Sequence, residues 1–145
     1  MQTRTERIQK DIETLAQFTS TPGKGVTRSS YSKEDTMAKY YLTGEMKKIG
    51  LEIYEDGFGT LFGRREGTMK DAPVVMLGSH YDSVVNGGAF DGVAGSVSAL
   101  EVMRVLTEEG FVNDYPLELI LMNAEEGATF GPSTGVSNSR AMLGT

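Results

Sequence analysis

Apolar residues recur every three or four positions in three stretches of the chain, and this spacing predicts three amphipathic helices. The expected helices span residues 3–19, 33–49 and 92–109. Ser32, with Asp35 three residues later, forms a weak capping box at the start of the second helix. These signals place helices at the beginning, in the first third and beyond the middle of the chain.

Short apolar or alternating runs between the helices predict strands. Residues 51–54 and 60–64 are expected to form a hairpin through a turn at Asp56-Gly57. Residues 74–77 are continuously apolar, which is typical of a strand buried on both faces, and residues 117–122 form a similar run. Because a helix separates these last two runs, their order predicts a βαβ crossover. We expect an α/β fold with a mixed, largely parallel sheet flanked by helices.

Length and charge narrow the class of protein. A chain of 145 residues can form one domain with a sizeable core, and we expect a single domain over residues 1–145. The net charge of −6 argues against nucleic-acid binding, which requires a basic surface. The chain has no cysteine, which excludes disulfides and thiolate metal sites. No signal peptide and no run of membrane-spanning length is recognisable, so we expect a cytoplasmic protein without a membrane partner.

Chemistry-bearing residues follow the two strands of the predicted crossover. His80, the only histidine, and Asp82 come after the first strand, and Glu125 and Glu126 come after the second. In open α/β sheets ligands bind outside the carboxyl ends of the strands, so these side chains are expected at one rim. Asp91 follows a glycine-rich loop at the entry to the intervening helix. Imidazole and carboxylates are good ligands for zinc and similar divalent ions.

The residue types allow a division of roles. Asp82 is two residues from His80 and suits a carboxylate that orients the imidazole. Asp91 has two carboxylate oxygens and can bridge two metal ions. Glu125 and Glu126 are adjacent, so their side chains diverge: one can bind metal while the other acts as a general base.

Each of these residues also has a simpler interpretation. His80 could be structural, Asp91 could be the N-cap of the next helix, and Gly87-Gly88 could be only a turn. Paired glutamates are usually solvated surface, which is the interpretation favoured for Glu108-Glu109. The metal site is favoured because the residues occur together, in this order, at strand ends.

Three motifs resemble those of the M20 metallopeptidase superfamily, in particular its hydantoinase/carbamoylase amidase branch. The first motif covers residues 78–84, and the second, Asn-Gly-Gly-Ala-Phe-Asp-Gly-Val-Ala-Gly, covers residues 86–95. The third comprises Glu125-Glu126-Gly127, Phe130-Gly131 and Ser139-Arg140-Ala141. The branch includes N-carbamoyl-L-amino-acid hydrolases, allantoate amidohydrolases and β-ureidopropionases. The second and third motifs favour it over the peptidases.

The resemblance implies a role for each candidate residue. His80, Asp91 and Glu126 would be metal ligands, with Asp91 bridging two ions, and Asp82 and Glu125 would be the catalytic pair. In that pair Asp82 would orient His80 and Glu125 would be the general base. The implied reaction is hydrolysis of a C–N bond in a small carbamoyl or ureido substrate such as an N-carbamoyl amino acid or allantoate. The implied cofactors are two divalent ions of zinc, manganese, cobalt or nickel.

Family members are longer and carry further histidine ligands and a smaller lid domain, none of which corresponds to a segment of this chain. The resemblance therefore implies the amino-terminal part of a catalytic domain, without the lid domain. With two ligands for each ion, we expect partial metal occupancy and little turnover by the chain alone, since catalytic zinc usually has three protein ligands. The alternatives are a non-catalytic remnant, which could self-associate through an exposed sheet edge, and an M20 aminopeptidase or deacylase.

Overall fold

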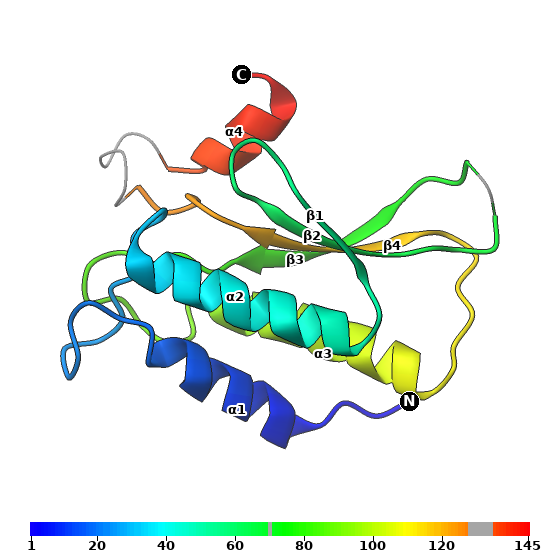
Figure 1. Ribbon diagram of the computed structural model, residues 1–145, viewed down its shortest axis with the longest axis horizontal. Coiled ribbons are helices and arrows are strands. Elements are labelled where there is room, and N and C mark those ends of the chain that lie inside the picture. The colour runs from blue at the N-terminus through cyan, green and yellow to red at the C-terminus, as the bar shows by residue number, and fades with distance from the viewer. Residues whose placement is uncertain (70, 128–134) are drawn as a thin grey trace.

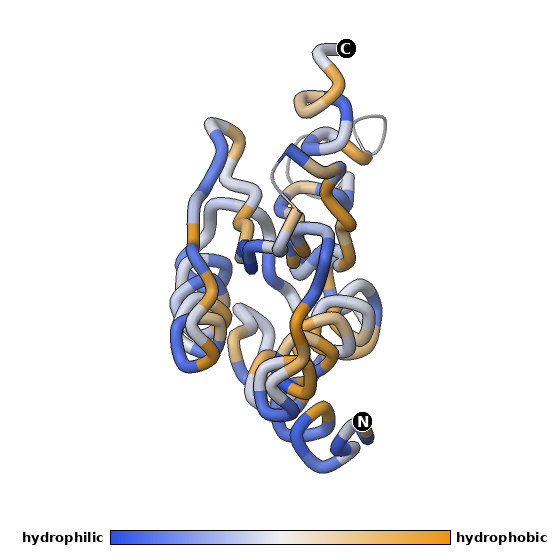
Figure 2. Tube along the Cα trace, turned by 90° about the vertical axis from the view of Figure 1, so that its right-hand side faces the viewer, coloured by the Kyte–Doolittle hydropathy of each residue, from blue (hydrophilic) through white to orange (hydrophobic). Residues whose placement is uncertain are grey.

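The computed structural model describes residues 1–69, 71–127 and 135–145, which form four helices and four strands (Figure 1). The elements in chain order are α1 (Thr5–Ala16), α2 (Lys33–Lys48), β1 (Glu52–Glu55), β2 (Leu61–Arg65), β3 (Val75–His80), α3 (Val93–Glu108), β4 (Leu117–Met122) and α4 (Ser137–Leu143). No helix among the described residues is both long and apolar enough to cross a membrane. The two termini lie at opposite ends of the molecule (Figures 1 and 2).

The four strands form one mixed sheet in the order β1-β2-β4-β3. β1 and β2 are the expected antiparallel hairpin, and β3 and β4 are parallel and joined through α3. The predicted α/β class and the βαβ crossover are thus confirmed. The parallel share is smaller than we expected, because β2 also pairs with β4 in the antiparallel direction.

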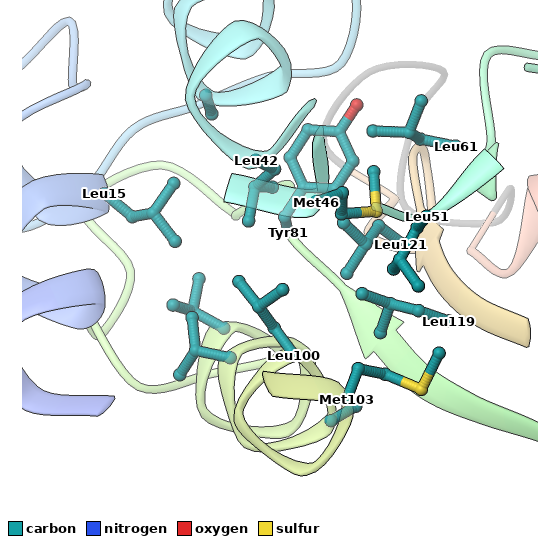
Figure 3. Close-up of a cluster of buried hydrophobic side chains, with 14 of the residues drawn as sticks. Leu15, Leu42, Met46, Leu51, Leu61, Tyr81, Leu100, Met103, Leu119 and Leu121 are labelled. Carbon is teal, nitrogen blue, oxygen red and sulfur yellow. The ribbon is translucent and has the colours of Figure 1, made fainter. Parts of the chain in front are cut away.

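The helices α1, α2 and α3 lie on the same side of the sheet and enclose one hydrophobic core (Figures 1 and 3). Leu42 and Met46 of α2 and Leu100 of α3 are fully buried and meet Leu119 and Leu121 of β4. Leu119 and Leu121 are two positions apart along β4, so their side chains point to the same face of the sheet. The core thereby anchors β4, whose carboxyl end carries two of the candidate site residues.

The expectation that residues 74–77 are buried on both faces is wrong. Val75 and Met76 are 50% and 46% exposed, because β3 is the edge strand of the described sheet. α3 covers only one face of β3, where Gly95 lies close to Ser79. A continuously apolar run indicated a strand, but its neighbours decided how deeply it is buried.

Local sequence signals predicted the ends of α2 correctly, but not those of α1 or α4. The hydroxyl of Ser32 accepts a hydrogen bond from the backbone N–H of Asp35, which confirms the predicted cap of α2. Gly50, with φ of +74°, follows α2 as expected. The first helix is shorter than the predicted 3–19, and α4 was not predicted because its seven residues carry little apolar periodicity.

Candidate metal centre

The five candidate residues meet at the rim where β3 and β4 end. His80 is the last residue of β3 and pairs in register with Met122 of β4. Asp82 follows two residues later, and Glu125 and Glu126 lie just beyond β4. Parallel strands joined by a crossover end at the same edge, which is why residues more than forty positions apart in sequence come together.

The ring of His80 is oriented by Asp82. His80 is only 8% exposed. Its Nδ1 lies 3.1 Å from the backbone oxygen of Asp82 and 3.5 Å from Oδ1 of the same residue. Its Nε2 lies 3.7 Å from Oε2 of Glu125 and 3.9 Å from Oδ1 of Asp91. One ring nitrogen is therefore held by Asp82, and the other faces the acidic residues.

Asp82 also holds the segment that follows β4. Its Oδ1 accepts a hydrogen bond from the backbone N–H of Glu125 at 3.2 Å, and its Oδ2 accepts one from the N–H of Glu126 at 2.9 Å. Ala124, just before these two residues, is fully buried and has φ of +60°. A left-handed alanine is strained, and such strain is common where a chain must turn sharply at a functional site.

Three side chains at this rim can hold a metal ion. His80, Asp91 and Glu126 each offer one ligand atom, and these atoms lie within 4.8 Å of one another. Two ligands of one zinc ion at ordinary bond lengths are at most about 4.2 Å apart. The three atoms could therefore close on one ion through small side-chain movements, or be shared between two ions. The residue types and spacing fit a divalent metal.

Gly92 leaves room for the imidazole. It has φ of +62°, and a Cβ atom built on it would lie 2.4 Å from Nε2 of His80. Gly92 is also the N-cap of α3 and makes no side-chain cap bond, so the alternative interpretation of Asp91 as N-cap is wrong. Ser96, in the first turn of α3, donates from Oγ to the backbone oxygen of His80 at 2.8 Å. The amino-terminal end of α3 thus packs against His80.

The charges at the rim favour a bound cation. Burial opposes protonation of His80, but its hydrogen bond to Asp82 and the charges of Asp82 and Glu125 outweigh this and raise its pKa. Burial raises the pKa of Glu126, and the charges of Asp91, Glu125 and Asp82 raise it further. Neighbouring carboxylates contribute to both shifts, and a divalent ion would neutralise their negative charge.

The remaining motif residues have more ordinary surroundings. Glu108 and Glu109 are exposed, as predicted, and Glu108 pairs with Arg4 at 3.3 Å. Ser139 of the third motif lies in α4 and donates to the sulfur of Met122 at 3.8 Å. Phe130-Gly131 of the same motif lies outside the described residues.

Two residues that sequence reasoning missed border the site: Ser96 and Arg28. Ser96 occupies one polar position in an otherwise apolar stripe of α3, which is a weak signal. Arg28 lies in a loop without periodicity, and its contacts connect it to residues more than fifty positions away. No local pattern could have indicated it.

Curated proteins and solved structures with similar sequences include amidohydrolases and amidases. An N-carbamoyl-L-amino-acid amidohydrolase of Paenarthrobacter aurescens is 48% identical over 96% of this chain and 33% of its own length. The allantoate amidohydrolase of Bacillus subtilis is 39% identical over 82% of this chain and 29% of its own. The crystal structure of a hydantoinase/carbamoylase family amidase from Burkholderia vietnamiensis has a TM-score of 0.91 and 33% identity, covering 98% of this chain and 34% of that one. The chain thus spans about a third of the length of these relatives.

The names of these relatives confirm the amidase branch that the motifs indicated. The family whose sequence profile matches is described as Peptidase family M28, whereas the motifs resemble those of the M20 superfamily. The match covers residues 60–143 and so includes β2, the crossover and all five candidate residues. The matched segment is more than half of the 145 residues. The chain therefore belongs to peptidase family M28 and shares its fold with the hydantoinase/carbamoylase amidases.

Proposed function

We propose that this chain belongs to a metal-dependent amidohydrolase that cleaves C–N bonds in N-carbamoyl amino acids or in ureido compounds such as allantoate. One observation carries the proposal: the ligand atoms of His80, Asp91 and Glu126 lie within 4.8 Å of one another. Glu125, whose carboxylate can serve in proton transfer, lies 3.7 Å from the same imidazole.

The substrate class rests on the relatives. Curated proteins similar to this chain are named N-carbamoyl-L-amino-acid amidohydrolase, allantoate amidohydrolase and ureidoglycolate hydrolase. This chain matches only about a third of the length of each of these proteins. We therefore propose that residues 1–145 serve as the amino-terminal part of a catalytic domain.

His80, Asp91 and Glu126 would hold the metal, and Asp91 would bridge if two ions bind. When bound, a divalent ion would supply Lewis acidity, lowering the pKa of a water molecule and polarising a carbonyl. Zinc, manganese, cobalt and nickel all accept this set of one nitrogen and several oxygen ligands. Asp82 would keep Nδ1 of His80 occupied, so that Nε2 remains available to the ion.

We assign Glu125 as the general base. Its side chain is 30% exposed, and its Oε2 lies 3.7 Å from Nε2 of His80. Its carboxylate would take a proton from water as the oxygen bonds to the carbonyl carbon, and would give that proton to the nitrogen as the C–N bond breaks.

The name of the matching family favours a second candidate, hydrolysis of a peptide or acyl bond. The same general base and the same ligands would serve that reaction. Ammonia release from N-carbamoyl amino acids and allantoate, compared with amine release from peptides and acyl amino acids and measured on the complete catalytic domain, distinguishes the two.

Metal binding tests the proposal independently of turnover. After dialysis against manganese or zinc, metal analysis should find bound ion in the native chain and much less in His80→Asn and Glu126→Gln. Glu125→Gln should retain the ion, because it removes the proton acceptor and none of the three ligands. Glu109→Gln, at an exposed position on the end of α3, is the matched control and should leave metal binding unchanged.

Absence of bound metal in the native chain would contradict the proposal. Because three ligands are few for two ions, we expect partial occupancy and little turnover by the 145-residue chain. Robust turnover by this chain would show that further ligands are not essential.

A further inference from the structure

We propose that Arg28 is a positioning residue for the metal centre, acting through the backbone on both sides of Asp82. The inference rests on the function proposed above. Arg28 does not itself belong to the group of ligand atoms, and it lies in the loop between α1 and α2. It is 1% exposed, which makes it one of the largest fully buried side chains of the described residues.

The guanidinium group joins the segment after β3 to the end of α1. Its Nε donates to the backbone oxygen of Tyr81 at 2.6 Å. Its Nη1 donates to the backbone oxygens of Leu15 and Phe18 at 2.7 and 3.2 Å. Leu15 lies in the last turn of α1 and Phe18 just beyond its end, where the helix dipole favours a cation.

The backbone of Arg28 holds the residue on the other side of Asp82. The N–H of Arg28 donates to Oγ of Ser83 at 2.9 Å, and the N–H of Ser83 donates to the oxygen of Arg28 at 3.0 Å. Oγ of Ser83 also donates to the oxygen of Val26 at 3.1 Å. Tyr81 and Ser83 are therefore both fixed to Arg28, and the residue between them cannot shift without breaking these bonds.

Asp82 passes this constraint on to the metal ligands. Its carboxylate accepts the N–H groups of Glu125 and Glu126, and its backbone oxygen lies 3.1 Å from Nδ1 of His80. A rotation of the peptide between Tyr81 and Asp82 would move all three contacts together. Metal sites tolerate displacements of only a few tenths of an ångström, so such a rotation would weaken ion binding.

The environment of Arg28 differs from that of an arginine that only supports packing. Burial lowers its pKa, and in the described part of the chain its side-chain hydrogen bonds all go to backbone carbonyls. Arg104, also buried, pairs with the carboxylates of Asp11 and Glu45 between the helices. A buried guanidinium without a direct carboxylate partner is costly, and its planar set of donors suits the alignment of several carbonyls.

The test compares Arg28→Met and Arg28→Lys with Arg104→Met, the matched removal of a buried arginine that contacts none of the ligands. The dissociation constant for Mn²⁺ is measured by competition with a chelator, and the visible absorption of bound Co²⁺ reports the ligand geometry. Urea unfolding of each metal-free variant identifies the conditions in which it is folded.

Arg28→Met should weaken Mn²⁺ binding about tenfold or more, as loss of groups that orient metal ligands usually does, and should alter the Co²⁺ spectrum. Arg28→Lys should recover part of the affinity, because an ammonium group can still donate to the carbonyl of Tyr81. Arg104→Met should lower stability and leave both metal readouts unchanged. If Arg28→Met does not fold, Arg28→Lys decides, with affinity between the native value and a tenfold loss expected.

Native affinity and an unchanged Co²⁺ spectrum in the folded Arg28 variants would overturn this inference alone. A native chain that binds no ion would overturn the proposed function and this inference with it. The two failures are therefore distinguishable by the native measurement.

Discussion

Replacing Gly92 with alanine would place a methyl group inside the candidate metal centre, against the ring of His80. The new Cβ would lie 2.4 Å from Nε2 and Cε1 of His80, whereas ordinary contacts of this kind need at least about 3.4 Å. The imidazole would have to move by roughly 1 Å, which is several times the tolerance of a metal site. We expect Gly92→Ala to lose at least about tenfold in affinity for Mn²⁺ or Zn²⁺.

Gly92 also has a left-handed backbone, and an alanine in that conformation costs about 1–2 kcal/mol whether or not it meets a neighbour. Gly110 provides the matched control, because it follows the same helix with φ of +60° and a methyl group added there would meet no atom within 4 Å. Gly110→Ala should therefore lower the free energy of unfolding by a similar amount and leave metal affinity unchanged. Gly92→Ala should cost roughly a further 1 kcal/mol, because displacing His80 weakens its hydrogen bond to Asp82.

Chelator competition gives the affinities, and urea unfolding of the metal-free protein gives the stabilities. Equal metal affinity in the two alanine variants would refute the argument that Gly92 is required to make room for the imidazole. A loss of affinity confined to Gly92→Ala, after both variants are shown to be folded, is the expected result.

Three further changes test other parts of the site and fold. Asp82→Asn should weaken metal binding about 10–100-fold, as measured by chelator competition. Both carboxylate oxygens of Asp82 accept a hydrogen bond from a backbone N–H, and in asparagine one of these oxygens becomes an NH₂ group that cannot accept it. The raised pKa of His80 stabilises the metal-free fold below the unfolded pKa of about 6.5 and this contribution is lost as the pH rises through the folded pKa. Urea unfolding between about pH 6 and 8 should therefore show falling stability in the native protein and a flatter profile in His80→Asn, and parallel profiles would contradict this. Arg104→Met should lower the free energy of unfolding by about 3–5 kcal/mol, since it leaves the buried carboxylate of Asp11 unpaired, and a loss below about 1 kcal/mol would argue against that ion pair.

The local pattern was sufficient for the elements and for the topology that carries the site. Helical periodicity and the caps at Ser32 and Gly50 depend on residues a few positions apart, so they can be recognised along the chain. The same is true of the crossover between β3 and β4, since a helix between two apolar runs implies parallel strands. The common rim of His80, Asp82, Glu125 and Glu126 followed from that topology.

Other features depended on contacts that no local pattern records. The exposure of Val75 and Met76 follows from the position of β3 at the edge of the described sheet, not from its composition. The antiparallel pairing of β2 with β4 joins segments more than fifty residues apart. The exposure of β3 and the pairing of β2 are properties of the assembled sheet, because both depend on which elements lie next to these strands.

The sequence by itself determined the first three helices, the βαβ unit and the common rim of His80, Asp82, Glu125 and Glu126, since periodicity and strand ends are local features with a known geometry. Only the tertiary structure decided how those side chains are held: by Asp82 across the two strand ends, by the missing Cβ of Gly92 and by the buried guanidinium of Arg28. The physical reason is that hydrogen bonds and steric contacts act over a few ångströms of space, whatever the separation of the residues along the chain.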